Sequence, residues 1–152
     1  MHSEVQASYA HISGEMNGEM RNKLHYEIHG LTSPDAPTIV FSSGLGGAAK
    51  FWQPQLGDFA QDYRVITYDH YGTNKSVGDL PANYSISNMA DELAALLRKL
   101  EVQACHFVGH ALGGLVGLEL ALSKPKLLQS LVLVNACSSP NPHTLRCFNI
   151  RK

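Results

Sequence analysis

The residues that most directly suggest chemistry are the pentad Gly109-His110-Ala111-Leu112-Gly113. Its outer glycines match the G-x-S-x-G nucleophile elbow, a tight and strained turn that joins a buried strand to a helix. Small residues occupy the outer positions because only they let the strand and the helix approach so closely. The centre holds Ala111, whose methyl group cannot attack a carbonyl. The pentad predicts the turn and argues against an acyl-enzyme mechanism.

Four other side chains could contribute to a site. His110 could act as a general base, because an unperturbed histidine side chain changes charge near neutral pH, but a residue at this position packs beside the sheet, so we favour a structural role. Asp69 could hold water or an ammonium-like group, although a capping role in a turn is the interpretation we prefer. Cys137 is the one thiol that could replace the missing nucleophile, but a buried or half-buried Cys more often acts as a small hydrophobe. Trp52 is expected to pack a helix onto the sheet.

Two pairs of histidines have a spacing that could suggest a metal site. His106 and His110 are four residues apart, as are His25 and His29. On a strand this separation is roughly 13 Å along the axis, too far for one zinc ion. We therefore predict no metal site and no cofactor.

Size and composition limit the class of protein. The chain has 152 residues, enough for one domain, and a formal net charge of −1, which gives no electrostatic reason to expect binding to nucleic acid or an anionic membrane. Its first residues lack the basic head and apolar run of a signal peptide, and Glu119 and Lys124 interrupt the longest apolar run. Three cysteines without C-x-x-C spacing fit a reducing compartment. We expect a cytoplasmic protein whose partner is a small-molecule substrate, and a homodimer stays open.

The elements that must position these residues begin after a polar segment. Residues 1–23 show no period of 2 or 3.6 and are predicted to be a disordered tail. Residues 24–152 are predicted to belong to a single domain. Alternation over residues 24–30 predicts a half-exposed edge strand, followed by a turn at residues 33–37.

Short apolar runs then alternate with helical segments. We predict strands at residues 38–41, 64–68, 105–108 and 131–135, the last of them buried, and helices at residues 48–60, 87–101 and 115–122. The second helix carries an apolar stripe from Met89 to Leu100, with Asp91 and Glu92 in its first turn and Ser87 or Asn88 as its N-cap. Strands that are apolar on both faces and alternate with helices predict an α/β fold with a mostly parallel sheet, whose ligand site lies beyond the carboxyl ends of the strands.

Several motifs resemble the RutD family of α/β-hydrolase-fold proteins, which belong to the bacterial pyrimidine-utilisation pathway. They are residues 43–47 (SGLGG), 51–56 (FWQPQL), 68–69 (YD), 83–86 (NYSI), 108–113 (VGHALG) and 143–148 (HTLRCF). The resemblance covers residues from about 37 to 152, and the His-Ala-Leu elbow is itself a family trait. It implies a three-layer α/β-hydrolase fold and a hydrolase of aminoacrylate or carbamate. It also implies that Trp52 lies near the pocket mouth and that Ala111 is native.

Two departures from the family matter. The common Asp-x-Arg-Gly motif reads Asp69-His70-Tyr71-Gly72 here, which removes an arginine. The chain also stops where the family continues into the lid, the last strands and the loops that supply the acidic and histidine partners. It therefore resembles the N-terminal portion of such a protein.

The resemblance places an oxyanion hole on backbone N–H groups, which do not require Ser at position 111. These are the N–H of Leu112 and one from the loop after the first core strand, at Leu45 with Gly46 as a neighbouring candidate. Gly44 and Gly46 could alternatively serve only to make that loop tight. Because ligands bind beyond the carboxyl ends of the strands, we expect the substrate pocket to be lined by Gly44, Gly46, Asp69 and Cys137, and the resemblance adds Trp52.

The expected function is assistance to the hydrolysis of a small C–N substrate of uracil breakdown, by polarisation and water positioning and without a covalent intermediate. Two alternatives stay open: a non-catalytic ligand-binding module that keeps the hydrolase pocket, and an inactive truncated fragment. A conventional serine esterase is the weakest interpretation. The last strand should expose an apolar edge, so a poorly cooperative or self-associating product is expected.

Overall fold

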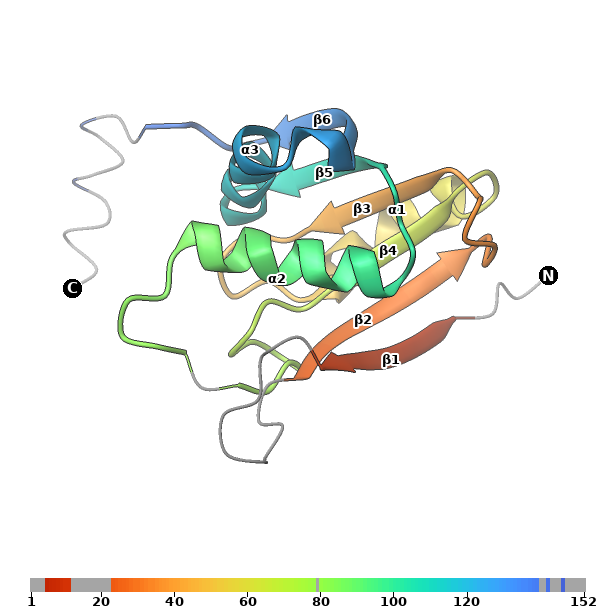
Figure 1. Cartoon of the computed structure of the whole chain (residues 1–152), viewed down its shortest axis with the longest axis horizontal. Helices are drawn as coiled ribbons and strands as arrows, with labels where there is room; N and C mark the ends of the chain where they lie inside the picture. The colour runs from red at the N-terminus through yellow and green to blue at the C-terminus, as the bar shows by residue number, and fades with distance from the viewer. Residues whose placement is uncertain (1–4, 12–22, 79, 140–141, 143–145, 147–152) are drawn as a thin grey trace.

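The computed structural model describes residues 5–11, 23–78, 80–139, 142 and 146 of the chain (Figure 1). Six strands form one sheet in the order β1-β2-β4-β3-β5-β6. Their bounds are β1 Gln6–His11, β2 Lys23–Gly30, β3 Thr38–Ser42, β4 Arg64–Tyr68, β5 Cys105–His110 and β6 Leu128–Val134. β3, β4, β5 and β6 run parallel, while β1 and β2 pair antiparallel. The predicted α/β fold with a mostly parallel sheet is confirmed.

Helices cover both faces of the sheet. The short 3-10 helix η1, Ala49–Trp52, leads into α1, Gln53–Phe59, on one face, while α2, Ile86–Lys99, and α3, Leu112–Ser123, lie on the other (Figure 1). A second 3-10 helix, η2, Pro125–Leu127, connects α3 to β6. None of the helices in the described part of the chain is long and apolar enough to cross a membrane.

Each face of the sheet has its own apolar core. The larger core packs α2 and α3 on the sheet through side chains such as Leu93, Leu97, Val116 and Phe107. The smaller core packs η1 and α1 on β3 and β4, and its members are Ile39, Phe41, Trp52, Leu56 and Val65. Burial on both faces explains why β3 and β4 read as continuous apolar runs in the sequence.

The N-cap of helix α2 lies two or three residues before the predicted position. Its N-cap is Ser85, not Ser87 or Asn88, and a capping box joins the Ser85 hydroxyl and backbone N–H to the backbone and side chain of Asn88. Asp91 and Glu92 consequently lie beyond the first turn, which contains no acidic residue. The apolar stripe was predicted correctly, since Met89, Leu93, Leu96 and Leu97 are buried.

Three expectations about the strands are wrong. Gln6–His11, inside the predicted disordered tail, forms β1, while residues 1–4 and 12–22 lie outside the described residues. Because β1 pairs with β2, β2 is an internal and largely buried strand instead of a half-exposed edge. Among the described residues, the strand predicted to be buried at residues 131–135 is the edge strand β6, where Val132, Leu133 and Val134 are 49%, 40% and 37% exposed.

Candidate active site at the strand ends

The four parallel strands end at one edge of the sheet, where the predicted site residues gather. β5 ends at His110, and Ala111 makes the turn into α3 with φ 49° and ψ −111°. Residues other than glycine rarely adopt this backbone conformation, which belongs to strained sites in proteins. The elbow is thus formed as the pentad predicts, although the residue that carries the strain has no nucleophile.

Close backbone contacts impose this turn. A Cβ placed on Gly109 would lie 2.4 Å from the carbonyl oxygen of Gly113, and one on Gly113 would lie 2.3 Å from that of Ser42. The Ala111 carbonyl accepts hydrogen bonds from the N–H groups of Gly114 and Leu115, and its N–H donates to the Val134 carbonyl at 2.9 Å. The start of α3 is therefore pressed against the ends of β3, β5 and β6.

The loop after β3 lies directly beside the elbow. A Cβ on Gly44 would lie 3.3 Å from the Ala111 Cβ and 3.0 Å from Nδ1 of His110. The loop is tied back by a hydrogen bond from the Gly47 N–H to the Gly44 carbonyl at 2.9 Å, and Gly46 has φ 71°. Leu45 is 81% exposed, so its side chain faces solvent.

This arrangement can provide a site for an anion. Leu112 is the first residue of α3, and the first N–H groups of a helix have no acceptor within the helix. The positive end of the helix dipole lies at the same place. The structure therefore brings together the two segments, at Leu45 and at Leu112, that the sequence assigns to an oxyanion hole.

His70 fixes the loop after β3 through a contact with its backbone, a role that sequence reasoning missed. Its Nε2 lies 3.0 Å from the carbonyl oxygen of Ser43, the residue before Gly44. Burial lowers the pKa of His70, and the hydrogen bond to Ser43 and the nearby Asp69 only partly oppose this. A neutral imidazole with its proton on Nε2 donates to the carbonyl and fixes the peptide between Ser43 and Gly44. The one sequence signal for this role is the position of His70 just after the end of β4, at the edge of the sheet where ligands bind.

Asp69 organises the loops. Its Oδ1 accepts the Ala49 N–H at 2.7 Å, and its Oδ2 accepts the Asn74 side-chain N–H at 2.9 Å and the Lys75 N–H at 3.3 Å. Nδ1 of His25 lies 3.3 Å from Oδ2. Because the Asp69 side chain is fully buried, these contacts support the turn-forming role and not contact with a substrate.

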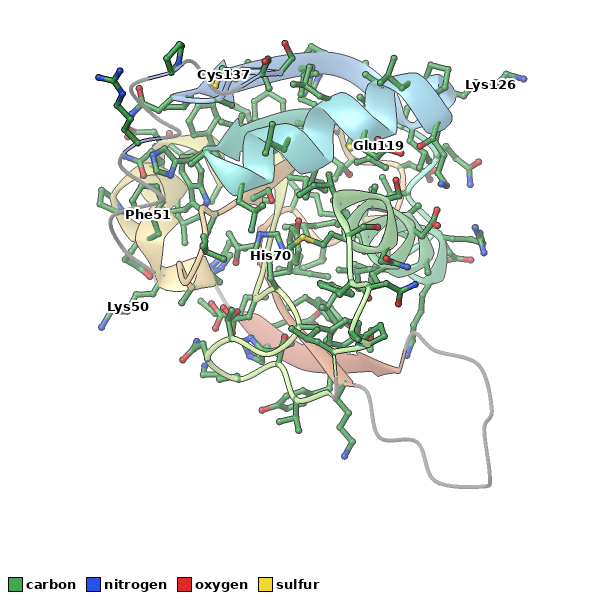
Figure 2. The ribbon with its side chains drawn as sticks, turned by 90° about the vertical axis from the view of Figure 1, so that its left-hand side faces the viewer. Lys50, Phe51, His70, Glu119, Lys126 and Cys137 are labelled. Carbon is green, nitrogen blue, oxygen red and sulfur yellow. The ribbon has the colours of Figure 1, made fainter. Side chains whose placement is uncertain are left out.

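The two aromatic residues of η1 make different contacts, and only Phe51 contacts the elbow. Phe51 stacks on His110, with ring centroids 5.0 Å apart and planes at 24°. Trp52 is buried and packs against Phe41, as predicted for a residue that joins a helix to the sheet. His110 therefore lies against the β3 loop and η1. In Figure 2, Phe51 and Cys137 lie toward one end of the molecule, while Lys126 lies toward the other.

The cysteines and histidines are placed as follows. Cys137 is exposed just after β6, which corrects the expectation of a buried or half-buried thiol, whereas Cys105 is buried.

His25 and His29 are buried on β2 on either side of Glu27. Within the described ranges, no three His, Cys, Asp or Glu side chains are grouped as a metal ion would need.

Two separate hydrogen-bonded pairs of polar side chains lie on the α2 side of the elbow. The Ser42 and Tyr68 hydroxyls are hydrogen bonded at 2.7 Å, and the Tyr84 hydroxyl donates to Glu92. Burial raises the pKa of Glu92 to about 7 and that of Tyr71 to about 12. Tyr71 stands where the related motif carries Arg, and its buried hydroxyl has no hydrogen-bond partner among the described residues. Glu92 thus has no arginine at this position to stabilise its charged form.

Comparisons with known proteins agree with this geometry. A RutD protein of Stutzerimonas stutzeri (strain A1501), a proposed carbamate hydrolase, is 65% identical over 128 residues, which are 84% of this chain and 48% of the relative. The corresponding protein of Pseudomonas syringae pv. syringae (strain B728a) is 58% identical over 129 residues, 85% of this chain and 50% of the relative. The chain spans about half the length of the curated relatives it matches.

Solved structures give the same result for the fold. An enol-lactonase from Burkholderia xenovorans LB400 superposes with a TM-score of 0.76 at 29% identity, over 95% of this chain and 54% of that one. A hydrolase from Pseudomonas aeruginosa PA01 gives a TM-score of 0.78 at 28% identity, over 95% and 51% of the two chains. The model of the alpha/beta hydrolase fold family matches residues 37–151. The chain belongs to the α/β-hydrolase fold family, and within that family it is similar to RutD proteins.

Proposed function

We propose that this chain carries the anion-binding half of a hydrolase that assists the breakdown of a small C–N substrate, aminoacrylate or carbamate, in pyrimidine utilisation. The observation that carries the proposal is the elbow, which keeps its strained turn at Ala111 beside Gly44 although no nucleophile stands there. Strain of this kind persists where the surrounding structure enforces it and marks functional sites. The similarity to RutD proteins supports the choice of substrate class.

Both candidate substrates carry a carboxylate, and the proposed site is suited to one. The N–H groups of Leu112 and Leu45 would donate to its oxygens at the amino end of α3. Attack by water on the carbon that bears nitrogen, with the nitrogen leaving as ammonia, then requires no covalent bond to the protein. For carbamate the other product is bicarbonate. For aminoacrylate the second carbon of the double bond takes up a proton, and loss of ammonia from the water adduct leaves an oxo acid. Negative charge that develops on oxygen in this step is stabilised by the same N–H donors.

The rate enhancement asked of such a site is modest. Enzymes stripped of their catalytic triad retain roughly 10³–10⁴-fold acceleration over water through binding and the oxyanion hole alone. Aminoacrylate and carbamate decompose without an enzyme, so acceleration of this size is enough to matter. The proposal therefore needs neither Ser at position 111 nor Cys137.

The test is to fill the space between the loop and the elbow. In Gly44→Ala the new methyl group would lie 3.3 Å from the Ala111 Cβ, and the φ of Gly44 is outside the left-handed region, so the backbone tolerates alanine. We expect about a 10²-fold loss of ammonia release, the loss that a displacement of about 1 Å in a substrate causes. The assay uses this chain joined to the half of the Stutzerimonas relative that it does not match. Gly57→Ala is the matched control, because nothing lies within 4 Å of a Cβ there.

Two results would contradict the proposal. One is unchanged ammonia release in Gly44→Ala, which would place the reaction elsewhere. The other is a covalent adduct, trapped and located by mass spectrometry at any residue of the active joined protein.

A second candidate, a ligand-binding module without turnover, is favoured by the absence of a nucleophile at Ala111. It predicts saturable binding of a small carboxylate such as acrylate to the 152-residue chain, weakened by Gly44→Ala, with no ammonia release above the spontaneous rate in the joined protein. Isothermal titration calorimetry beside the ammonia assay distinguishes the two functions.

A further inference from the structure

The helices α2 and α3 lie side by side on one face of the sheet, and α2 extends further (Figure 1). The Ser87 hydroxyl on α2 donates to Glu119 on α3 at 2.8 Å, and about one turn further along both helices Asp91 pairs with Lys124. Lys124 is the C-cap of α3, whereas α2 continues beyond Asp91 for about two turns. A proline at the start of η2 stops α3 there, and the last two turns of α2 extend past its end.

A groove of about 600 Å³ lies beside these two turns. Arg98 and Val102 line it from α2 and the residues that follow α2, while Lys124, Lys126 and Leu127 line it from the end of α3 and from η2. We call it the α2–η2 groove. A space of this size accommodates a small organic molecule, and side chains such as Val102 and Leu127 offer such a molecule apolar surface.

The α2–η2 groove concentrates positive charge, although the formal net charge of the whole chain is −1. Its lining includes the three basic residues Arg98, Lys124 and Lys126 and no acidic residue. Lys124 is paired with Asp91, but among the described residues neither Arg98 nor Lys126 forms an ion pair. Two positive charges at the groove therefore lack a counter-charge in the part of the chain that the structure describes.

Capping of α2 does not account for Arg98. Basic side chains in the last turn of a helix can donate to its final carbonyls, which otherwise lack partners. In α2 these carbonyls are already bonded, three by backbone N–H groups and one by the Arg64 guanidinium at 3.0 Å. They belong to Leu96, Leu97, Arg98 and Leu100. The exposed Arg98 side chain is therefore not needed as their donor and is available to a ligand.

We propose that the α2–η2 groove binds a phosphate monoester of an apolar alcohol. The two cations without a counter-charge, Arg98 and Lys126, match the charge of a phosphate monoester, which approaches −2 at neutral pH. A guanidinium also binds phosphate oxygens through two parallel hydrogen bonds. The organic group lies against Val102 and Leu127. A carboxylate would compensate only one of the two cations, and inorganic phosphate would leave the apolar surface without a partner.

The α2–η2 groove is separate from the elbow. α3 begins at the elbow with Leu112 and ends at the groove with Ser123, so its 12 residues separate the two sites by about 18 Å. Figure 2 shows Lys126 toward the end of the molecule opposite to Phe51, which stacks on His110 of the elbow strand. The inference therefore does not rest on the proposed function, and the two sites can be tested separately.

The experiment measures binding of 1-naphthyl phosphate by saturation-transfer difference NMR, with the 152-residue chain at low micromolar concentration. For a ligand of this size we expect a Kd of about 0.5 mM. Arg98→Gln and Lys126→Gln should each raise this Kd about tenfold, because each removes a hydrogen bond to a charged group. Lys99→Gln is the matched control: Lys99 lies in the same last turn of α2 but does not line the groove, so the Kd should not change.

Two comparison compounds and one more variant complete the test. 1-Naphthol and inorganic phosphate, used as a competitor, should each bind at least about tenfold more weakly than the probe, because each offers half of its contacts. Gly44→Ala, which alters the elbow, should leave the Kd of the probe unchanged.

Four results would overturn the proposal. The first is no saturation transfer at ten times the expected Kd. The second is an equal loss in Lys99→Gln and Arg98→Gln, since binding would then follow overall charge. The third is equal binding of 1-naphthol, which would mean adsorption to apolar surface. The fourth is a loss in Gly44→Ala alone, which would place the probe at the elbow.

Discussion

Replacing Ala111 with glycine should stabilise the protein, the reverse of the usual effect of glycine. Ala111 has φ 49° and ψ −111°, a conformation that costs a residue with a Cβ about 1–3 kcal/mol. Glycine releases that strain and loses about 0.5–1 kcal/mol through the greater freedom of the unfolded chain. The net expectation is a gain of about 1 kcal/mol in the free energy of unfolding, equal to about 2–4 °C in the melting temperature of a chain of this size.

The assay is urea unfolding followed by circular dichroism at low micromolar concentration, where self-association is weakest. Ala95→Gly is the control, because Ala95 lies inside α2 and glycine there should cost about 1 kcal/mol. The two substitutions should therefore have opposite signs. If Ala111→Gly destabilised the chain as much as Ala95→Gly does, the turn at residue 111 would not be strained and the argument for an enforced elbow would fail.

Three further predictions concern packing, pH and thiols. Gly113→Ala should lower the free energy of unfolding in urea by about 3 kcal/mol, because its Cβ would lie 2.3 Å from the Ser42 carbonyl oxygen and overpacking costs about this much. Gly57→Ala should not destabilise the protein. Equal urea midpoints for the two variants would contradict the close contact. Burial raises the pKa of Glu92 from its ordinary value of 4.5 to about 7 in the folded state. The protonated carboxyl therefore contributes fully to stability when the pH is below 4.5, and this contribution is lost as the pH rises through 7. Glu92→Gln should therefore gain stability relative to wild type between pH 5 and pH 8, and a constant difference would refute the assignment. In a Cys147→Ser background, Ellman's reagent should modify the exposed Cys137 rapidly and leave the buried Cys105 unmodified. Burial also raises the pKa of the Cys105 thiol to about 12. Two rapidly modified thiols would show that Cys105 is accessible.

The parallel core of the fold was predictable because its strands are apolar on both faces. Residues 38–41 and 64–68 read as continuous apolar runs, and both are buried between two helical layers. β6 has the same pattern and is nevertheless an exposed edge. The apolar sequence of β6 is typical of a strand that is packed on both faces, but the described chain packs helices against only one face of it. The pattern therefore predicted the strand correctly and its burial wrongly.

Two of the remaining errors, on β1 and on His70, come from contacts between residues distant in the sequence, whereas the misplaced N-cap of α2 is a choice among neighbouring residues. β1 has a weak pattern of its own and exists through its pairing with β2. Three polar residues, Ser85, Ser87 and Asn88, are all suitable caps, and the capping box that decides among them is visible only in coordinates. His70 contacts a carbonyl 27 residues earlier in the chain, so its sequence neighbourhood does not suggest that contact.

The contacts that shape the elbow have a consequence for how this family can change over time. The turn at residue 111 is imposed by the backbone of Gly109, Gly113 and Ser42, and none of these contacts involves the side chain at 111. Most serine codons differ from an alanine codon by one nucleotide. A lineage can therefore lose a serine nucleophile, or regain one, without rebuilding the scaffold around it. On such a backbone, covalent and non-covalent chemistry are neighbouring evolutionary states separated by a single mutational step.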